Sequence, residues 1–176
     1  MNYLGLDIST SVVGVTLLDD NGELIFCEAW DLRPLEKDLL VKADVVKQNL
    51  QNIKLPVDYI MIEQPLERFI QGRSSIKTIL MLAKFNCLIS YICKEMWGVV
   101  PEYLAATSAR KKCGIVAPRG ENVKEFVLKY LLDTEPNFNI EYTRHGNPKH
   151  GSFDRADSFV VARAGFELCK LKSSES

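Results

Sequence analysis

Four acidic residues stand where their carboxylates could act together on a substrate. Asp7 lies in the apolar run YLGLDI, and Glu63 closes a second apolar run, YIMIE. Asp154 and Asp157 are three residues apart in FDRADSF, a spacing that places both side chains on one face of a helix. An ionised Asp7 among apolar residues is costly unless it is paired or bound to a metal ion, so Asp7 is the strongest candidate of the four.

The other three acidic residues each have an ordinary structural explanation. Glu63 can simply mark where a buried strand reaches the surface, and aspartates such as Asp154 and Asp157 are common in the first turn of a helix. The four are more informative together, because several negative charges cannot persist in one partly buried pocket. Such a pocket needs hard divalent cations, and oxygen ligands suit Mg²⁺ or Mn²⁺. Two such ions about 4 Å apart can activate water and stabilise the leaving oxygen in phosphodiester cleavage.

The elements that would position these residues alternate along the chain. Apolar and β-branched runs predict strands over 2–8, 11–18 and 23–30, with hairpin punctuation at Asp19–Gly22. The remaining pattern predicts helices over 34–53, 74–97, 122–133 and 153–171, a buried strand over 57–63 and an edge strand over 99–103. We therefore expect an α/β fold with a five-stranded mixed sheet, three antiparallel strands followed by two parallel ones, and helices on both faces.

The composition fits one ordinary globular domain. The 176 residues are 47% hydrophobic and 26% charged, and we expect a single domain over 1–172 with a frayed tail over 173–176. A net charge of −1 does not suit a protein that holds nucleic acid through bulk positive charge. The five cysteines lack metal-ligand spacing, which indicates reduced thiols in the cytoplasm or another reducing compartment.

Four blocks of the sequence resemble the RuvC-type Holliday junction resolvases. They are YLGLDISTSVVGVTLLDDNGELI, YIMIEQPLERF, ATSARKKCGI followed by NVKEFVLKYLL, and FDRADSFVVARA. The resemblance spans nearly the whole chain and keeps the order and spacing of the blocks. It implies a ribonuclease H-like fold, a homodimer, and a magnesium-dependent endodeoxyribonuclease that nicks paired strands of branched DNA in recombination and repair.

The resemblance also implies roles for individual residues. Asp7, Glu63, Asp154 and Asp157 match the family's acidic positions, so we expect them to be catalytic and to bind two Mg²⁺ or Mn²⁺ ions. The DNA-binding residues implied are Arg110, Lys111, Lys112, Arg119 and Lys124, and we expect Lys111 or Lys112 near the scissile phosphate, Lys112 being counted as catalytic. The family's second lysine falls near Glu121, so Lys124 matches it only loosely.

Two loops carry further candidates for DNA contact. In the loop after Glu63, Phe69 is a candidate wedge that opens the junction core, although it could equally pack in the protein core. Arg68 and Arg73 flank it and could contact phosphates. A polar loop beside the acidic pair carries Arg144, His145, Lys149, His150 and Arg155; it could approach the DNA backbone or be an ordinary exposed loop.

The 74–97 helix is more apolar than one core-facing stripe requires. Lys77, Lys84 and Lys94 interrupt it, so we expect no membrane span. Either it is fully buried in one subunit, or part of it forms a two-fold dimer that would place two active sites symmetrically. Two other interpretations stay open: a nucleotide-binding domain of the actin-like and sugar-kinase type, and a non-catalytic nucleic-acid-binding module of the same fold.

Overall fold

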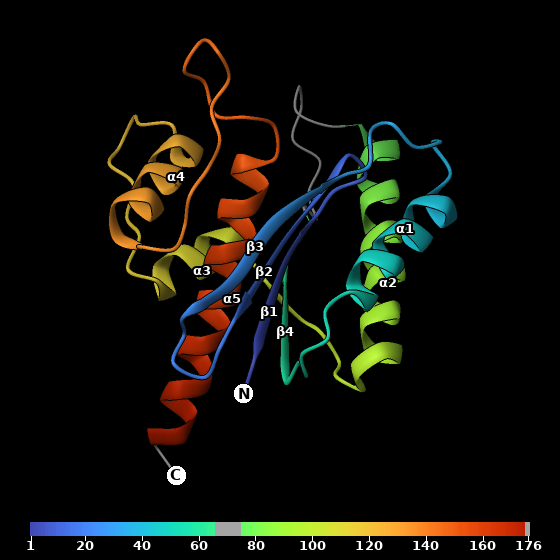
Figure 1. Ribbon diagram of the computed structural model, residues 1–176, viewed down its shortest axis with the longest axis horizontal. Helices are drawn as coiled ribbons and strands as arrows, with labels where there is room; N and C mark the ends of the chain where they lie inside the picture. The colour runs from blue at the N-terminus through green and yellow to red at the C-terminus, as the bar shows by residue number, and fades with distance from the viewer. Residues whose placement is uncertain (66–74, 175–176) are drawn as a thin grey trace.

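A mixed sheet separates two layers of helices in the computed structural model, which describes residues 1–65 and 75–174 (Figure 1). Its strands are β1 (Tyr3–Ile8), β2 (Val12–Leu18), β3 (Leu24–Asp31), β4 (Tyr59–Glu63) and β5 (Glu102–Leu104). They lie in the order β3-β2-β1-β4-β5, antiparallel through the meander and parallel from β1 to β5. The predicted five-stranded arrangement is confirmed, and β5 lies at the edge where Pro101 placed it.

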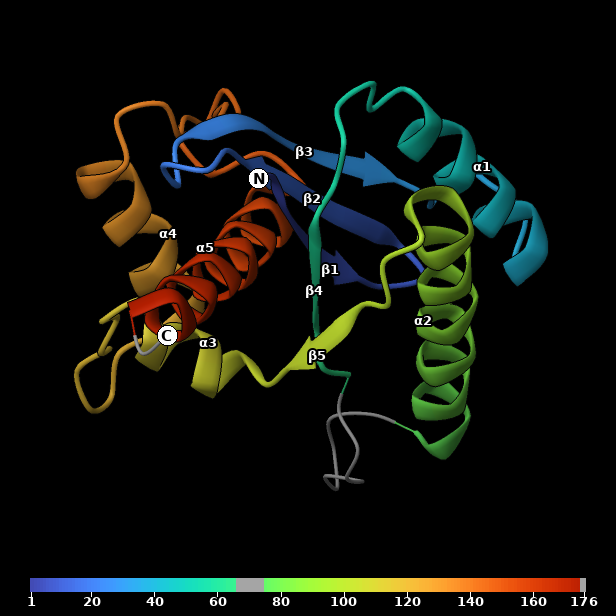
Figure 2. The same ribbon diagram turned by 90° about the horizontal axis from the view of Figure 1, so that it is seen from below.

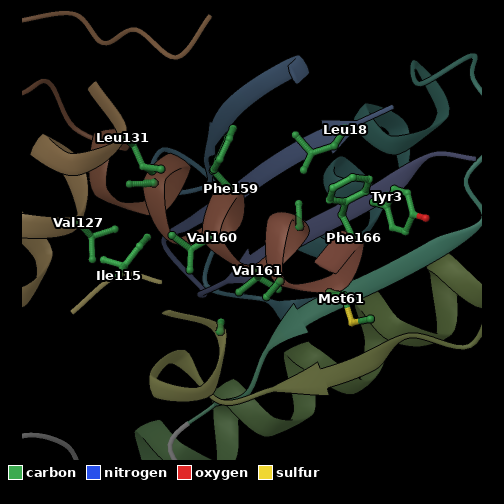
Figure 3. Packing of buried hydrophobic residues seen from close by; sticks show 14 of the residues in the cluster. Tyr3, Leu18, Met61, Ile115, Val127, Leu131, Phe159, Val160, Val161 and Phe166 are labelled. Atoms are coloured by element: carbon green, nitrogen blue, oxygen red, sulfur yellow. The ribbon is translucent and has the colours of Figure 1, made fainter. Parts of the chain in front are cut away.

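Helices cover both faces of the sheet, as predicted (Figure 2). One face carries α1 (Leu39–Gln51) and α2 (Ile76–Trp97), and the other carries α3 (Ala106–Lys112), α4 (Val123–Thr134) and α5 (Ser152–Ser174). Each layer has its own apolar core. The core on the α5 side contains Phe159, Val160 and Phe166, and Phe166 packs edge-on against Tyr3 (Figure 3).

The backbone of α5 lies unusually close to β1 and β2, because glycines face it. A Cβ added at Gly14 would lie 2.0 Å from the carbonyl oxygen of Asp154, and one at Gly5 would lie 2.3 Å from that of Ser158. The hydroxyls of Ser158 and Thr16 share a buried hydrogen bond of 2.8 Å in the same region. The first turns of α5 are therefore fixed against the strands by main-chain contact.

Some predicted boundaries are wrong. The first helix begins at Leu39 instead of residue 34, because Asp38 caps it by accepting from the Leu40 N–H, and Leu35 packs from a turn before it. Helix α3 was not predicted, since 7 residues are too few to show a helical period. Helix α5 continues through Ser174, past the helix end expected at 171.

Helix α2 exposes a broad apolar surface. Its buried residues are Phe85, Asn86, Ile89 and Cys93, whereas Leu80 is 55% and Tyr91 61% exposed. Complete burial within one subunit is therefore the wrong alternative. By length and composition alone α2 is apolar enough to cross a membrane, with a mean hydropathy of 1.5 and 22% of the segment buried, a test that helices of soluble proteins also pass.

Candidate active site

Three of the four predicted carboxylates meet at one end of the sheet. Asp7 and Glu63 lie near the carboxyl ends of β1 and β4, which are parallel neighbours. Helix α5 begins at the same end and supplies Asp157 (Figure 1). A carboxylate oxygen from each of the three lies within 4.8 Å of the other two, and all three side chains are half-buried. We call these residues the acidic pocket.

Burial and mutual repulsion act strongly on the acidic pocket. Burial, reinforced by the charge of Asp157, raises the pKa of Glu63 to about 7. Burial, reinforced by Glu63 and then Asp157, also holds the pKa of Asp7 well above its ordinary value. The pKa of Asp157 is raised by burial although Lys124 opposes the shift. Three oxygen donors at this spacing fit a hard divalent cation, because bound positive charge would relieve both the repulsion and the desolvation.

Asp154 lies beside the acidic pocket. It precedes Asp157 by one helical turn and is close enough to raise the pKa values of Asp7 and Glu63. Its carboxylate is nevertheless outside the group of oxygens that lie within 4.8 Å of one another. The structure thus gathers three of the expected ligands and places the fourth next to them.

Two cations approach the acidic pocket from separate helices. The ammonium nitrogen of Lys124, in the first turn of α4, lies 3.1 Å from Oδ2 of Asp157. Arg110 of α3 is near enough to lower the pKa values of Glu63 and Asp157. Lys124 stands three residues beyond Glu121, which precedes the helix cap Asn122, and its long side chain still reaches the carboxylates.

The other basic candidates lie elsewhere. Lys112 lines a separate cavity of about 210 Å³ with Glu135, Arg163 and Glu167. This cavity is separate from the acidic pocket, because Arg163, which lines it, is six residues after Asp157 and about 9 Å farther along α5. Lys111 and Arg119 are exposed. Consecutive helical residues point about 100° apart, so only one of the three basic residues of α3 can face the pocket, and the charge effects identify it as Arg110. Catalysis by Lys112 stays a prediction.

Two buried polar side chains that were not predicted hold the backbone next to Asp7. Lys42 of α1 donates to the Thr10 carbonyl oxygen at 2.5 Å, and Asn86 of α2 donates to the Ile8 carbonyl oxygen at 3.3 Å. Both are buried within helices that otherwise turn apolar residues inward. The sequence could have indicated Lys42, because this lysine lies on the buried face of α1, next to Ala43 and one turn before Val46.

The predicted wedge Phe69 and its neighbours Arg68 and Arg73 lie outside the described residues. Their roles at a junction therefore stay predictions.

No protein-family model matches the chain, and no curated protein sequence matches it. Solved structures match it along almost all of its length. Thermus thermophilus RuvC in complex with a Holliday junction substrate has a TM-score of 0.63 at 12% identity, covering 97% of this chain and 96% of that one. The yeast mitochondrial Holliday junction resolvase has a TM-score of 0.61 at 17% identity, covering 97% and 80%. Fowlpox virus resolvase, solved with Holliday junction DNA, has a TM-score of 0.51 at 15% identity, covering 100% of both chains.

These similarities establish the class of fold. The mixed sheet, its strand order and its flanking helices are those of the ribonuclease H-like proteins. Within that class, the chain has the fold of the RuvC-type Holliday junction resolvases.

Proposed function

We propose that this protein is a divalent-metal-dependent endonuclease that resolves branched DNA, with the four-way junction as its main substrate. The observation that carries the proposal is the acidic pocket, in which oxygens of Asp7, Glu63 and Asp157 lie within 4.8 Å of one another. The pocket stands at the end of a sheet with the resolvase fold. Oxygen donors whose pKa values are raised by burial and by mutual repulsion are suited to Mg²⁺ or Mn²⁺.

The residues around the pocket would divide the work of phosphodiester hydrolysis. Asp7, Glu63 and Asp157 would hold the metal, with Asp154 placed to complete a second position. When bound, a pair of such ions supplies an activated water and stabilises the leaving oxygen. Arg110 and Lys124 would hold and orient the phosphate, since fixed cations stabilise the charge that develops on its oxygens.

The class of substrate is supported by the similar structures. RuvC of Thermus thermophilus and the fowlpox virus enzyme were each solved with Holliday junction DNA. Arg110 and Lys124 beside the acidic pocket would supply a phosphate contact, and the pocket itself would supply a metal site. Branched DNA is therefore the substrate that fold and site support together.

The exposed apolar side of α2 supports a homodimer. Ile76, Leu80 and Tyr91 are each more than half exposed. A two-fold pairing through this helix would bury them and would present two acidic pockets to a substrate that is itself nearly two-fold symmetric. None of the five cysteines forms a disulfide, which supports function in a reducing compartment.

Cleavage of synthetic four-way, flap and linear duplex DNA tests the proposal. With Mg²⁺ the wild type should nick the four-way substrate symmetrically and leave the linear duplex intact. Asp7→Asn should bind the four-way substrate without cutting it. The matched control is Asp44→Asn, since Asp44 is exposed on α1 and should cut as the wild type does. Equal cutting of linear duplex, or cutting in EDTA, would contradict the proposal, and binding without cutting by the wild type would favour a non-catalytic module.

A further inference from the structure

A second group of cations lies beyond the first turn of α5. The chain before this helix folds into a hairpin over residues 141–150, with a bridge between Tyr142 and Pro148. Its turn is closed by hydrogen bonds from Thr143 N to Asn147 O at 2.8 Å and from Gly146 N to Thr143 O at 2.9 Å. The hairpin projects past the start of α5, at the end of the sheet that holds the acidic pocket (Figure 1). Arg144 and His145 are exposed at its tip.

The base of the hairpin is fastened to the helix that carries Asp157. The hydroxyl and the N–H of Ser152 both donate to the Lys149 carbonyl oxygen, at 2.7 and 3.2 Å. Gly151 joins hairpin and helix with φ of 88° and approaches β3 so closely that a Cβ would lie 2.6 Å from Cβ of Ala29. Hairpin, helix and strand therefore keep a fixed relation, and a ligand on the hairpin would have a defined position relative to the acidic pocket.

An open cleft of about 360 Å³ lies between β3 and the base of the hairpin, and we call it the hairpin cleft. It is lined by Cys27, Glu28, Ala29, Glu141, Lys149, His150, Ser152 and Arg155. Both of its acidic side chains are engaged: Glu141 pairs with Lys149, and Glu28 accepts from the indole N–H of Trp30 at 2.9 Å. His150 and Arg155 are its basic groups that form no ion pair among the described residues, although their charges act on Asp31 and Glu141 respectively.

Two arginines on this surface form no ion pair in the part of the chain that the structure describes, although the charge of Arg155 is close enough to lower the pKa of Glu141. Nε of Arg155 is buried and has no hydrogen-bond partner, while its guanidinium stands 5.6 Å from the centre of the Phe138 ring. Arg144 bonds through Nε to a nitrogen of His145 and has no carboxylate within ion-pair distance. A buried unpartnered donor is unfavourable, and the planar guanidinium matches the oxygens of a phosphate.

We propose that the hairpin cleft and Arg144 bind backbone phosphates of the DNA arm that enters the acidic pocket. The inference rests on the proposed function and extends its substrate contacts to a surface on β3 and the hairpin. Arg155 directly follows Asp154, and side chains of consecutive helical residues diverge by about 100°. Arg155 therefore faces β3 and the hairpin instead of the acidic pocket, and it would contact a phosphate of the same DNA arm away from the scissile one. Contacts of this kind position a substrate without reading its bases.

The salt dependence of DNA binding tests this surface. Binding of a four-way junction would be measured from low to moderate salt in the uncleaving Asp7→Asn background, with Arg144→Gln and Arg155→Gln added singly and together. Removing one phosphate-binding charge should reduce the slope of log K against log salt by about 1, to a similar extent for junctions of different sequence. Lys54→Gln is the matched control, because it removes one exposed charge from the connection before β4, at the other end of the sheet, and should leave the slope unchanged.

The outcomes separate the two proposals. If the Asp7→Asn protein does not bind junctions at all, the proposed function fails. If it binds them and Arg144→Gln and Arg155→Gln keep the parental slope, only the hairpin proposal is overturned. Arg144 is exposed at a turn, so its substitution does not endanger folding, and thermal melting shows whether the Arg155→Gln protein is folded. Arg155→Lys should restore the parental slope that Arg155→Gln reduces, because it restores the charge.

Discussion

Lys124 of α4 and Asp157 of α5 form an ion pair of 3.1 Å in which the lysine is 62% exposed and the aspartate 12%. The pair joins a solvent-facing cation to a largely enclosed carboxylate of the acidic pocket. Lys124 also lowers the pKa values of Asp7 and Glu63, so its charge acts on the pocket as a whole. A cation in this position has two effects: it attracts a phosphate, and it competes with a metal for the same carboxylates.

Lys124→Met should separate these effects. Loss of one fixed charge from the phosphate should slow junction cleavage by about 10²-fold at saturating metal. The Mg²⁺ concentration for half-maximal binding should fall, because the pocket becomes more negative. Single-turnover cleavage and metal titration would measure the two quantities, with Lys129→Met as a control on the same helix. A weaker affinity for Mg²⁺ in Lys124→Met would contradict this account.

Stability of the metal-free protein should fall as pH rises. The folded protein holds protons on Glu63 up to a pKa of about 7, against 4.5 for the ordinary residue, and the pKa of Asp7 is raised as well. Between these values the folded state binds more protons than the unfolded state, so the stabilisation present at pH 4.5 is lost by about pH 7. For Glu63 alone the loss is on the order of 3 kcal/mol. Urea unfolding in EDTA at pH 5 and pH 8 would measure it, and Mg²⁺ should restore stability at pH 8; equal EDTA stabilities at the two pH values would rule it out.

Glu63→Gln should make the metal-free protein more stable at pH 8 while abolishing cleavage. The amide removes one charge from three mutually repelling carboxylates and keeps the shape of the side chain. A gain of about 1–3 kcal/mol in the free energy of unfolding is expected. Glu125→Gln, an exposed position on α4, is the control. Unfolding measured in EDTA should show this gain only for Glu63→Gln; a destabilised Glu63→Gln protein would mean that the carboxylate is satisfied without a metal.

Gly14→Ala should destabilise the fold and impair cleavage together. Its new methyl group would lie 2.0 Å from the Asp154 carbonyl oxygen, so α5 must move away from β2. Overpacking costs about 1–3 kcal/mol, and a backbone obstacle belongs at the upper end. In Gly165→Ala the methyl group meets the flexible side chain of Met61 instead, so the cost should be smaller. Thermal melts and cleavage rates of the two variants would reveal the difference, and equal losses would contradict it.

Leu80→Glu with Tyr91→Glu should convert a dimer into monomers. Both side chains are more than half exposed on α2, and charges there would be buried without partners in a two-fold interface. Leu55→Glu, on the connection before β4, is the control for adding a charge at an exposed apolar position. Light scattering would give the mass, and a junction assay would show paired nicks replaced by single ones. A monomeric wild type would exclude this interface.

The layered fold could be predicted because its signals are local. The hairpin turn ending at Gly22, the buried run before Glu63 and the long apolar helix each have a clear period or punctuation. The boundaries of α1 were misplaced because Leu35 continues the helical spacing while its backbone forms a turn. Helix α3 is too short for any period to appear.

The candidate site could be predicted only in part. Residue types and order indicated the carboxylates, but the exclusion of Asp154 from the closest group depends on the depth at which α5 crosses the sheet. Arg110 faces the acidic pocket and Lys112 faces another cavity because of the rotation of α3 about its own axis. Depth and rotation are set by contacts between distant segments, which no local pattern encodes.

The contact between the α5 backbone and the two strand glycines affects how far the sequence can diverge during evolution. The first turns of the helix rest on Gly5 and Gly14 through main-chain atoms, so their height above the strands does not depend on the sizes of neighbouring core side chains. Apolar residues farther along the helix can then be exchanged during evolution at a cost in stability, while the spacing of the metal-binding oxygens is preserved. Such an arrangement allows chains that share few residues to keep one reaction geometry, provided that the two glycines remain.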